Sequence, residues 1–150
     1  MPNGTLANAF SRESVLLNRS AGSWREAIVL AGAGLVAAGV ATEAYTQAMI
    51  DVVETNGPYI VIAPGFALAH ARPSTEVLRW GMSLVTLAEP VAFDAGANDP
   101  VSVVVGLGAV DKDQHIEALA LLGEKLTDSP NLVNSLLKFS TFDDIIDFLS

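Results

Sequence analysis

The sequence contains two histidines, His70 and His115, and each lies where an imidazole can do chemistry. Residues 66–72 alternate large and small side chains, a pattern typical of a β-strand, so His70 and Arg72 are expected on the same face. Pro73 ends this strand because it has no N–H to donate to a ladder. An imidazole and a guanidinium are therefore predicted to meet where the strand ends.

His115 follows a loop of small residues and lies in the first turn of a predicted helix. The first turn of a helix carries unpaired N–H groups and the positive end of the helix dipole, so an anion is favoured there. A neutral imidazole has a nucleophilic nitrogen and can form a phosphoramidate. If His70 and His115 approach each other, they predict a histidine nucleophile beside donors suited to a phosphoryl group.

Other interpretations of these residues are weaker. A histidine on an apolar strand is often purely structural, which is the simplest alternative. Gly106-Leu107-Gly108 matches part of a dinucleotide-binding fingerprint, but Asp111 occupies the position of its third glycine. A metal site would combine His70 and His115 with Asp111 and Asp113, but only two imidazoles and no cysteine exist, so no metal is expected. No Gly-x-Ser-x-Gly motif marks a serine nucleophile.

The composition indicates one compact unit. A length of 150 residues fits a single domain over residues 1–150. The net charge is −9 and the basic residues are scattered, so no nucleic-acid partner is expected. No apolar run reaches the roughly 18 residues that would span a bilayer, so no membrane insertion is expected. The lack of cysteine predicts no disulfide or thiolate chemistry, and a cytoplasmic location is the resulting expectation.

Hydrophobic periodicity predicts two helices, then several strands, then three helices. Ser23 and Glu26 form a capping-box pattern at the start of the first helix. Residues 101–107 are almost all apolar and mostly β-branched, which predicts a central strand buried on both faces. This order indicates an α/β fold in which a mixed β-sheet is sandwiched by helices on both faces. The expected helices are 23–39, 42–56, one after residue 113, 130–138 and 141–149, and the expected strands are 59–63, 66–72, 80–87, 91–93 and 101–107.

Several local expectations are more specific. Residues 1–21 contain a short apolar piece but no clear element, and residues 74–78 are expected to form a helical turn. Glu89-Pro90 is expected to break a strand because proline cannot donate to a ladder. The helix after residue 113 is expected to bury one apolar face, made of Ile116, Leu119, Ala120 and Leu126.

Residues 63–73, Ala-Pro-Gly-Phe-Ala-Leu-Ala-His-Ala-Arg-Pro, resemble the phosphohistidine motif of enzyme IIA (EIIA) components of the bacterial phosphoenolpyruvate-dependent sugar phosphotransferase system (PTS), mannitol/fructose type. The ascorbate-type branch is the most similar, and the likeness extends over nearly the whole chain. It implies the PTS IIA mannitol/fructose-like fold and a phosphotransferase component without a cofactor. It also implies that His70 accepts a phosphoryl group from the phosphocarrier protein HPr and passes it to a IIB component, while His115 supports that group without carrying it.

The resemblance leaves alternatives open. One is a regulatory EIIA-like module, in which phosphorylation of His70 controls protein binding and not transport. Sugar specificity in the family usually lies in the membrane partner, so ascorbate, another sugar acid and a polyol all stay open as cargo, and so does a homodimer. The net charge of −9 predicts that charge steers association with a basic partner such as HPr, and an apolar contact through Phe66 and Leu68, near the motif, is the alternative.

Two positions depart from the family pattern. Ala69 stands where a proline usually precedes the active histidine, so the backbone there is expected to be less restrained. Val52 lies near the position where the mannitol and fructose branches often carry an arginine. A phosphoryl group carries about −1.5 to −2 charges at pH 7, so Arg72 is predicted to be the substitute cation that binds it.

Overall fold

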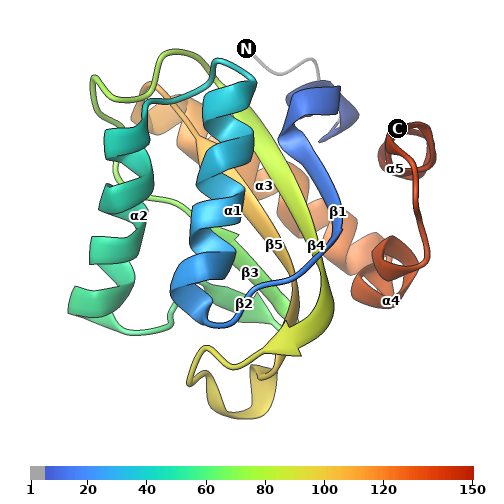
Figure 1. The fold of residues 1–150 in the computed structure, drawn as a ribbon. Helices are drawn as coiled ribbons and strands as arrows, with labels where there is room; N and C mark the ends of the chain where they lie inside the picture. The colour runs from blue at the N-terminus through green and yellow to red at the C-terminus, as the bar shows by residue number, and fades with distance from the viewer. Residues whose placement is uncertain (1–5) are drawn as a thin grey trace.

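The computed structural model describes residues 6–150, and residues 1–5 lie outside the described part. Figure 1 shows a central sheet with helices on both sides. Short 3₁₀ turns at Leu6–Ala9, Arg12–Ser14 and Gly96–Asn98 accompany the regular elements. In chain order the helices and strands are β1 (Val15–Arg19), α1 (Trp24–Ala37), α2 (Glu43–Asn56), β2 (Val61–Ala63), β3 (Phe66–Ala69), β4 (Gly81–Val91), β5 (Val101–Gly108), α3 (Lys112–Asp128), α4 (Leu132–Leu137) and α5 (Phe142–Leu149).

The sheet has five strands in the order β1-β4-β5-β3-β2. The pairs β1–β4 and β3–β5 are parallel, whereas β4–β5 and β2–β3 are antiparallel. β5 is the middle strand, which confirms the prediction from its apolar, β-branched sequence. Because β3 and β5 are parallel neighbours, they end at the same edge of the sheet, and β5 leads there into α3.

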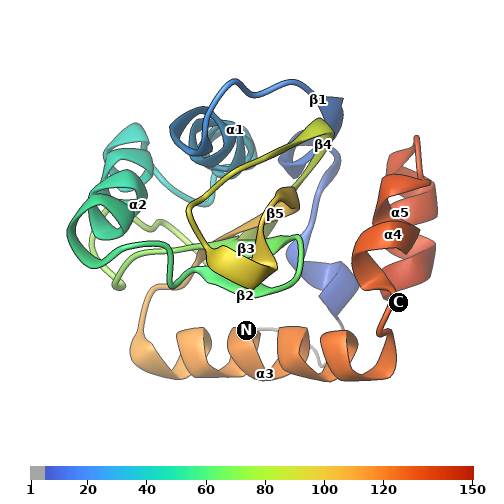
Figure 2. The ribbon, with the colours of Figure 1, turned by 90° about the horizontal axis from the view of Figure 1, so that it is seen from below.

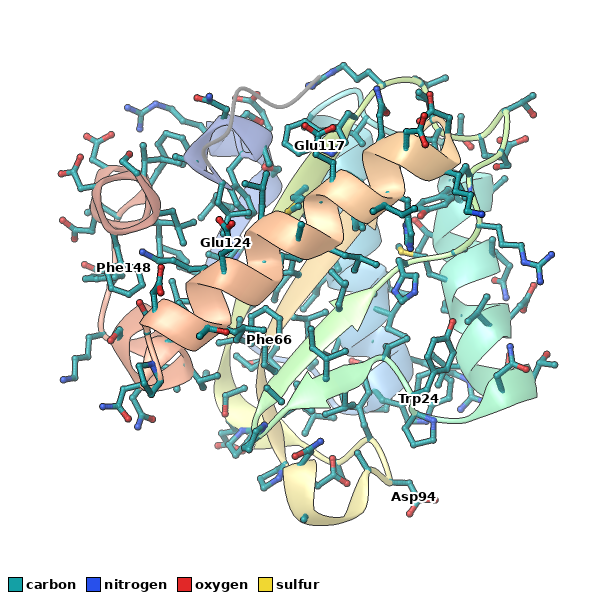
Figure 3. The ribbon with its side chains drawn as sticks, turned by 180° about the vertical axis from the view of Figure 1, so that it is seen from behind. Trp24, Phe66, Asp94, Glu117, Glu124 and Phe148 are labelled. Atoms are coloured by element: carbon teal, nitrogen blue, oxygen red, sulfur yellow. The ribbon has the colours of Figure 1, made fainter. Side chains whose placement is uncertain are left out.

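Helices cover both faces of the sheet, which confirms the predicted α/β fold with a mixed, sandwiched sheet (Figure 2). The helices α1 and α2 bury one face, and the alternating Ala67, Ala69 and Ala71 point into this layer. On the other face, α3 crosses the strands, and Phe66 and Leu68 pack with α3, α4 and α5 (Figure 3). The predicted alternation therefore separates the two cores correctly. The predicted end of the strand at Pro73 is wrong, because β3 ends at Ala69, so His70 and Arg72 lie beyond it.

Local sequence signals explain how α1 sits on the sheet. The Ser23 hydroxyl accepts from the Glu26 N–H at 3.3 Å, which caps the helix as its sequence predicts. Gly106 lets α1 approach β5 closely, since a Cβ at this position would meet Ser83 Oγ and Ala31. The glycines of Gly106-Leu107-Gly108 thus have a packing role.

Two strands differ from expectation. β1 forms within residues 1–21, where no clear element was predicted, by pairing with β4. β4 continues through Glu89-Pro90 to Val91, so the predicted break and the separate strand 91–93 are wrong. Residues 88–90 are exposed and the β4–β5 register shifts between Thr86 and Val91, which places the proline where regular pairing is interrupted.

Two further local differences lie near the histidines. Residues 74–78 form a turn and not a helix, and the Val77 N–H closes this turn by donating to the Ser74 carbonyl at 3.1 Å. The predicted buried face of α3 is wrong for three of its four members, because α3 instead buries Ala118 and Leu122. Apolar residues occur on nearly every side of this helix, so its periodicity does not select one face. The wrongly assigned residues are Ile116, which is 53% exposed, Leu119, which is 39% exposed, and Ala120.

Within residues 6–150, no helix is both long enough and apolar enough to cross a membrane.

Candidate functional site

His70 directly follows β3, at the edge of the sheet where β3 and β5 end. Its Nδ1 lies 2.8 Å from the carbonyl oxygen of Leu68. A carbonyl oxygen can only accept, so Nδ1 carries the hydrogen and Nε2 keeps its lone pair. The backbone of β3 therefore sets the tautomer of the ring and leaves Nε2 as its nucleophilic atom.

His115 lies in the first turns of α3, where its N–H donates to the carbonyl of the N-cap residue Asp111 at 3.1 Å. The ring centroids of His115 and His70 are 5.4 Å apart and their planes are tilted by 44°. The parallel pairing of β3 with β5 brings these two distant parts of the sequence to one place. An atom bound to one ring would therefore lie within reach of the other.

Burial lowers the pKa of His115, and the neighbouring His70 lowers it further. The ring is thus held in its neutral form near pH 7. The helix terminus itself offers fewer donors than expected, because the Asp111 carboxylate already accepts from the Gln114 N–H at 2.8 Å. The side chain of His115 is a further donor that this end of α3 offers to an anion.

Tyr59 lies beside His70, and Arg72 lies near Tyr59. The Tyr59 ring stands edge-on to the His70 ring, with centroids 5.8 Å apart and an angle of 86°. Burial raises the pKa of Tyr59, and the nearby Arg72 lowers it in part, which places the guanidinium within electrostatic reach of this phenol. Arg72 is exposed and makes no ion pair with any residue from 6 to 150, so its charge is available to a ligand.

Large apolar side chains are exposed in the segments around the two histidines. They are Tyr59, whose ring lies against His70, and Val110, Ile116 and Leu119, which lie within five residues of His115 in the chain, and we call them the apolar rim. Phe66 and Leu68, the alternative apolar contact for a partner, are only 1% and 0% exposed. That alternative is wrong, because both side chains point from β3 into the core beneath α3.

Sequence reasoning missed the roles of Tyr59 and Tyr45. Tyr59 precedes β2, whose antiparallel pairing with β3 brings it beside His70, and only that pairing would have revealed it. Tyr45 was predicted as a core residue of the second helix, and it is 1% exposed. Its hydroxyl, however, contacts the backbone at Ala71 and Leu107, beside the histidine site.

Neither a metal cluster nor the family arginine accompanies the histidines in the described part of the chain. Among residues 6–150, no three His, Cys, Asp or Glu side chains are grouped so that they could hold a metal ion. Val52 packs against the core on the α1–α2 side of the sheet. Arg72 lies two residues after His70 in the chain, and its charge acts on Tyr59.

The fold matches solved structures of phosphotransferase-system IIA proteins. A putative PTS IIA from Streptococcus mutans has a TM-score of 0.86 at 32% identity, covering 97% of this chain and 92% of that one. The mannitol enzyme IIA of Escherichia coli, solved in a complex with phosphorylated enzyme IIB, has a TM-score of 0.81 at 26% identity, covering 93% and 96%. This architecture defines the class, which is an α/β protein of the PTS IIA type.

Within this class, sequence similarity assigns the chain to one family. The family model "Phosphoenolpyruvate-dependent sugar phosphotransferase system, EIIA 2" matches residues 8–150, and the chain belongs to this family. It is 37% identical over 145 residues to the mannitol-specific cryptic phosphotransferase enzyme IIA component of Escherichia coli (strain K12), covering 97% of each chain. It is also 37% identical over 137 residues to the ascorbate-specific PTS system EIIA component of that organism, covering 91% of this chain and 89% of that protein. The resemblance inferred from residues 63–73 is confirmed.

Proposed function

We propose that the protein is a cytoplasmic phosphocarrier that accepts a phosphoryl group on His70 from HPr and passes it to a IIB component during sugar uptake. The observation that carries this proposal is the hydrogen bond between His70 Nδ1 and the Leu68 carbonyl. It leaves Nε2 with a free lone pair next to the His115 ring. A relative that forms a complex with phosphorylated enzyme IIB supports the second partner.

The transfer step is a displacement at phosphorus. The Nε2 lone pair of His70 attacks the phosphoryl group of a phosphohistidine donor, the new N–P bond forms, and the donor imidazole leaves with the electrons of the broken bond. The His70 ring then carries both Nδ1–H and the phosphoryl group, so positive charge develops on it. The Leu68 carbonyl accepts from Nδ1–H and stabilises that charge. Onward transfer is the same displacement with a nucleophile of the IIB component.

His115 and Arg72 support the phosphoryl group by different routes. A neutral His115 donates one N–H and its cation donates two, and a nearby dianion favours the cation. The guanidinium of Arg72 keeps its charge at working pH and is exposed. Arg72 is thus a permanent cation at the site, and His115 becomes a second one only when the phosphoryl group is present.

The apolar rim is the surface that meets both protein partners. Its exposed aromatic and aliphatic side chains lie on the segments around the two histidines, and His70 must contact another protein's phosphoryl group. The net charge of −9 favours a basic partner, and such charges act mainly on the rate of encounter. The mannitol and ascorbate relatives favour a polyol or a sugar acid as the cargo of the system.

The test is phosphorylation of the purified chain with phosphoenolpyruvate, enzyme I and HPr. Intact-protein mass spectrometry should show one added phosphate that is labile in acid and stable in base, as a phosphoramidate is. His70→Ala should abolish the label, and His115→Ala should keep it at a lower rate. If His70→Ala is still labelled and His115→Ala is not, the two roles are reversed and the proposal fails in its central residue.

A second arm distinguishes transport from regulation. Labelled protein is mixed with purified IIB components of the mannitol and ascorbate types, and the phosphate on each chain is followed. A carrier loses its phosphate to one of them. Retention of the label with both would favour the regulatory module over the transport role.

A further inference from the structure

The β3–β5 ladder stops one residue before His70. Its parallel register runs from Phe66 opposite Val103 to Ala69 opposite Gly106. Two residues further on, the same register would pair Ala71 with Gly108, and a parallel ladder would then join the Ala71 N–H to the Leu107 carbonyl. That direct bond is replaced by a bridge through a side chain.

The bridge is the hydroxyl of Tyr45, which reaches in from α2. The Ala71 N–H donates to this oxygen at 3.0 Å, and the hydroxyl lies 2.7 Å from the Leu107 carbonyl oxygen. A more distant contact of 3.2 Å joins it to the Ala71 carbonyl. A hydroxyl has one hydrogen, so the shorter contact with Leu107 takes it, and the oxygen accepts from Ala71.

The bridge is buried and stays intact over a wide pH range. Tyr45 is 1% exposed, and its burial raises the pKa of its hydroxyl, so the donor to Leu107 keeps its hydrogen. Two hydrogen bonds in series also span more than one direct N–H···O bond of about 2.9 Å. The hydroxyl therefore holds the ends of β3 and β5 apart.

These two strand ends carry the two histidines. His70 immediately precedes Ala71, and Leu107 is followed by the short connection to α3 and His115. We propose that Tyr45 is a positioning residue for phosphoryl transfer, whose hydroxyl sets the separation of the β3 and β5 ends and thereby the geometry of His70 relative to His115. The effect of Tyr45 on the rate of phosphoryl transfer rests on the proposed function, whereas its effect on the placement of His70 relative to His115 does not.

Tyr45→Phe is the direct test, since it removes one oxygen and keeps the ring. Without that oxygen the Ala71 N–H can bond the Leu107 carbonyl directly, which draws the strand ends together and moves His70. Transfer from HPr should lose about tenfold in kcat, because a misplacement of about 1 Å can lower a rate roughly 10²-fold and the expected movement of His70 is smaller than that. KM for HPr should be unchanged, since Tyr45 is buried and reaches no partner. In the unphosphorylated protein, the ring-proton NMR signals of both histidines should shift.

Thr86→Val is the matched control for the loss of a buried hydroxyl. Thr86 Oγ1 accepts from the Asn18 N–H at 2.8 Å, toward the opposite end of β4. This variant should lose stability but keep the wild-type kcat and histidine signals. The inference is overturned if Tyr45→Phe retains the wild-type kcat and signals, or if both variants lower kcat in proportion to their lost stability. If the wild-type chain takes no phosphate at all but Tyr45→Phe still shifts the histidine signals, the proposed function fails and the geometric role of Tyr45 stands.

Discussion

The two ends of the sheet differ in shape. At one end, the rings of His70 and His115 meet, and the apolar rim is exposed in the segments around them. Toward the other end, a cavity of about 620 Å³ opens between β1, β4 and the segment that joins α4 to α5. This cavity contains neither histidine, and its lining includes Leu17, Asn18, Thr86, Ser102 and Lys138.

Chemistry between two proteins needs a different surface from chemistry on a small molecule. Enzymes that act on small molecules usually enclose them in a concave site. A group that passes between two proteins instead needs a nucleophile that a partner's surface can reach. The histidine end meets this need. Tyr45 fixes the backbone next to His70, the Leu68 carbonyl fixes the His70 ring, and the apolar rim is exposed to a partner.

The largest expected effect in this comparison comes from replacing a cationic side chain by alanine at the histidine end, with the same replacement at the cavity end as the control. Arg72→Ala should lower phosphoryl transfer from HPr about tenfold or more, because a hydrogen bond to a charged group contributes roughly 1.5–3 kcal/mol. Lys138→Ala, in the lining of the cavity, should leave the rate unchanged. Equal losses in both variants, measured by quenched-flow labelling, would break the assignment of the chemistry to the histidine end.

A pair of exposed apolar residues tests the docking surface. Ile116 belongs to the apolar rim, whereas Leu137 is 40% exposed and lines the cavity at the other end. If a partner buries about 40 Å² of Ile116, the contact contributes about 1 kcal/mol, so Ile116→Ser should raise KM for HPr about fivefold. Leu137→Ser should not change KM. The opposite ranking of the two KM values would place the docking surface over the cavity.

Phosphorylation should change the charge of one end only. A dianion on His70 should raise the pKa of His115, because the attraction of a full neighbouring charge outweighs the partial charge of the helix terminus. A proton NMR titration before and after labelling measures this shift, and the backbone amide signals of Asn18 and Lys138 serve as controls that should not move. An unmoved or lowered pKa of His115 would mean that this ring does not touch the phosphoryl group.

The smallest expected effect is on stability in mild acid. The pKa of His115 in the folded, unphosphorylated protein is lowered from 6.5, so the unfolded chain binds a proton more readily. The contribution of His115 to stability is therefore fully present above pH 6.5 and is lost as the pH falls through the folded-state pKa. Urea unfolding between pH 8 and pH 5 should show this loss, and His115→Gln should lack that part of the slope. Parallel curves for the two proteins would contradict the lowered pKa.

Much of the fold was predictable because its signals are local. The apolar, β-branched run that became β5 and the cap at Ser23 can be read from a few neighbouring residues. The two-residue alternation around His70 assigned Ala69 and Ala71 to one core and Phe66 and Leu68 to the other. A period of two settles this assignment whatever lies opposite the strand.

The remaining features depend on partners that are distant in sequence. β1 is a short strand with a half-polar sequence that forms by pairing with β4, and the buried face of α3 was decided by the sheet. The sequence placed Tyr45 in the core correctly, but its hydroxyl gains a role only when Ala71 and Leu107 lie side by side. Arg72 was predicted beside His70 from their spacing in the sequence, and the structure places its charge close enough to act on Tyr59.

The hydrogen bond between His70 Nδ1 and the Leu68 carbonyl has a consequence for detecting the modification. Phosphohistidine exists as two regioisomers, the π form on Nδ1 and the τ form on Nε2, and they present different shapes to an antibody. Because Nδ1 is engaged by its own strand, the label on this chain should be the τ isomer alone. Immunoblots with isomer-selective antibodies would then report the loaded state of this protein in a cell extract separately from that of any carrier phosphorylated at the π position.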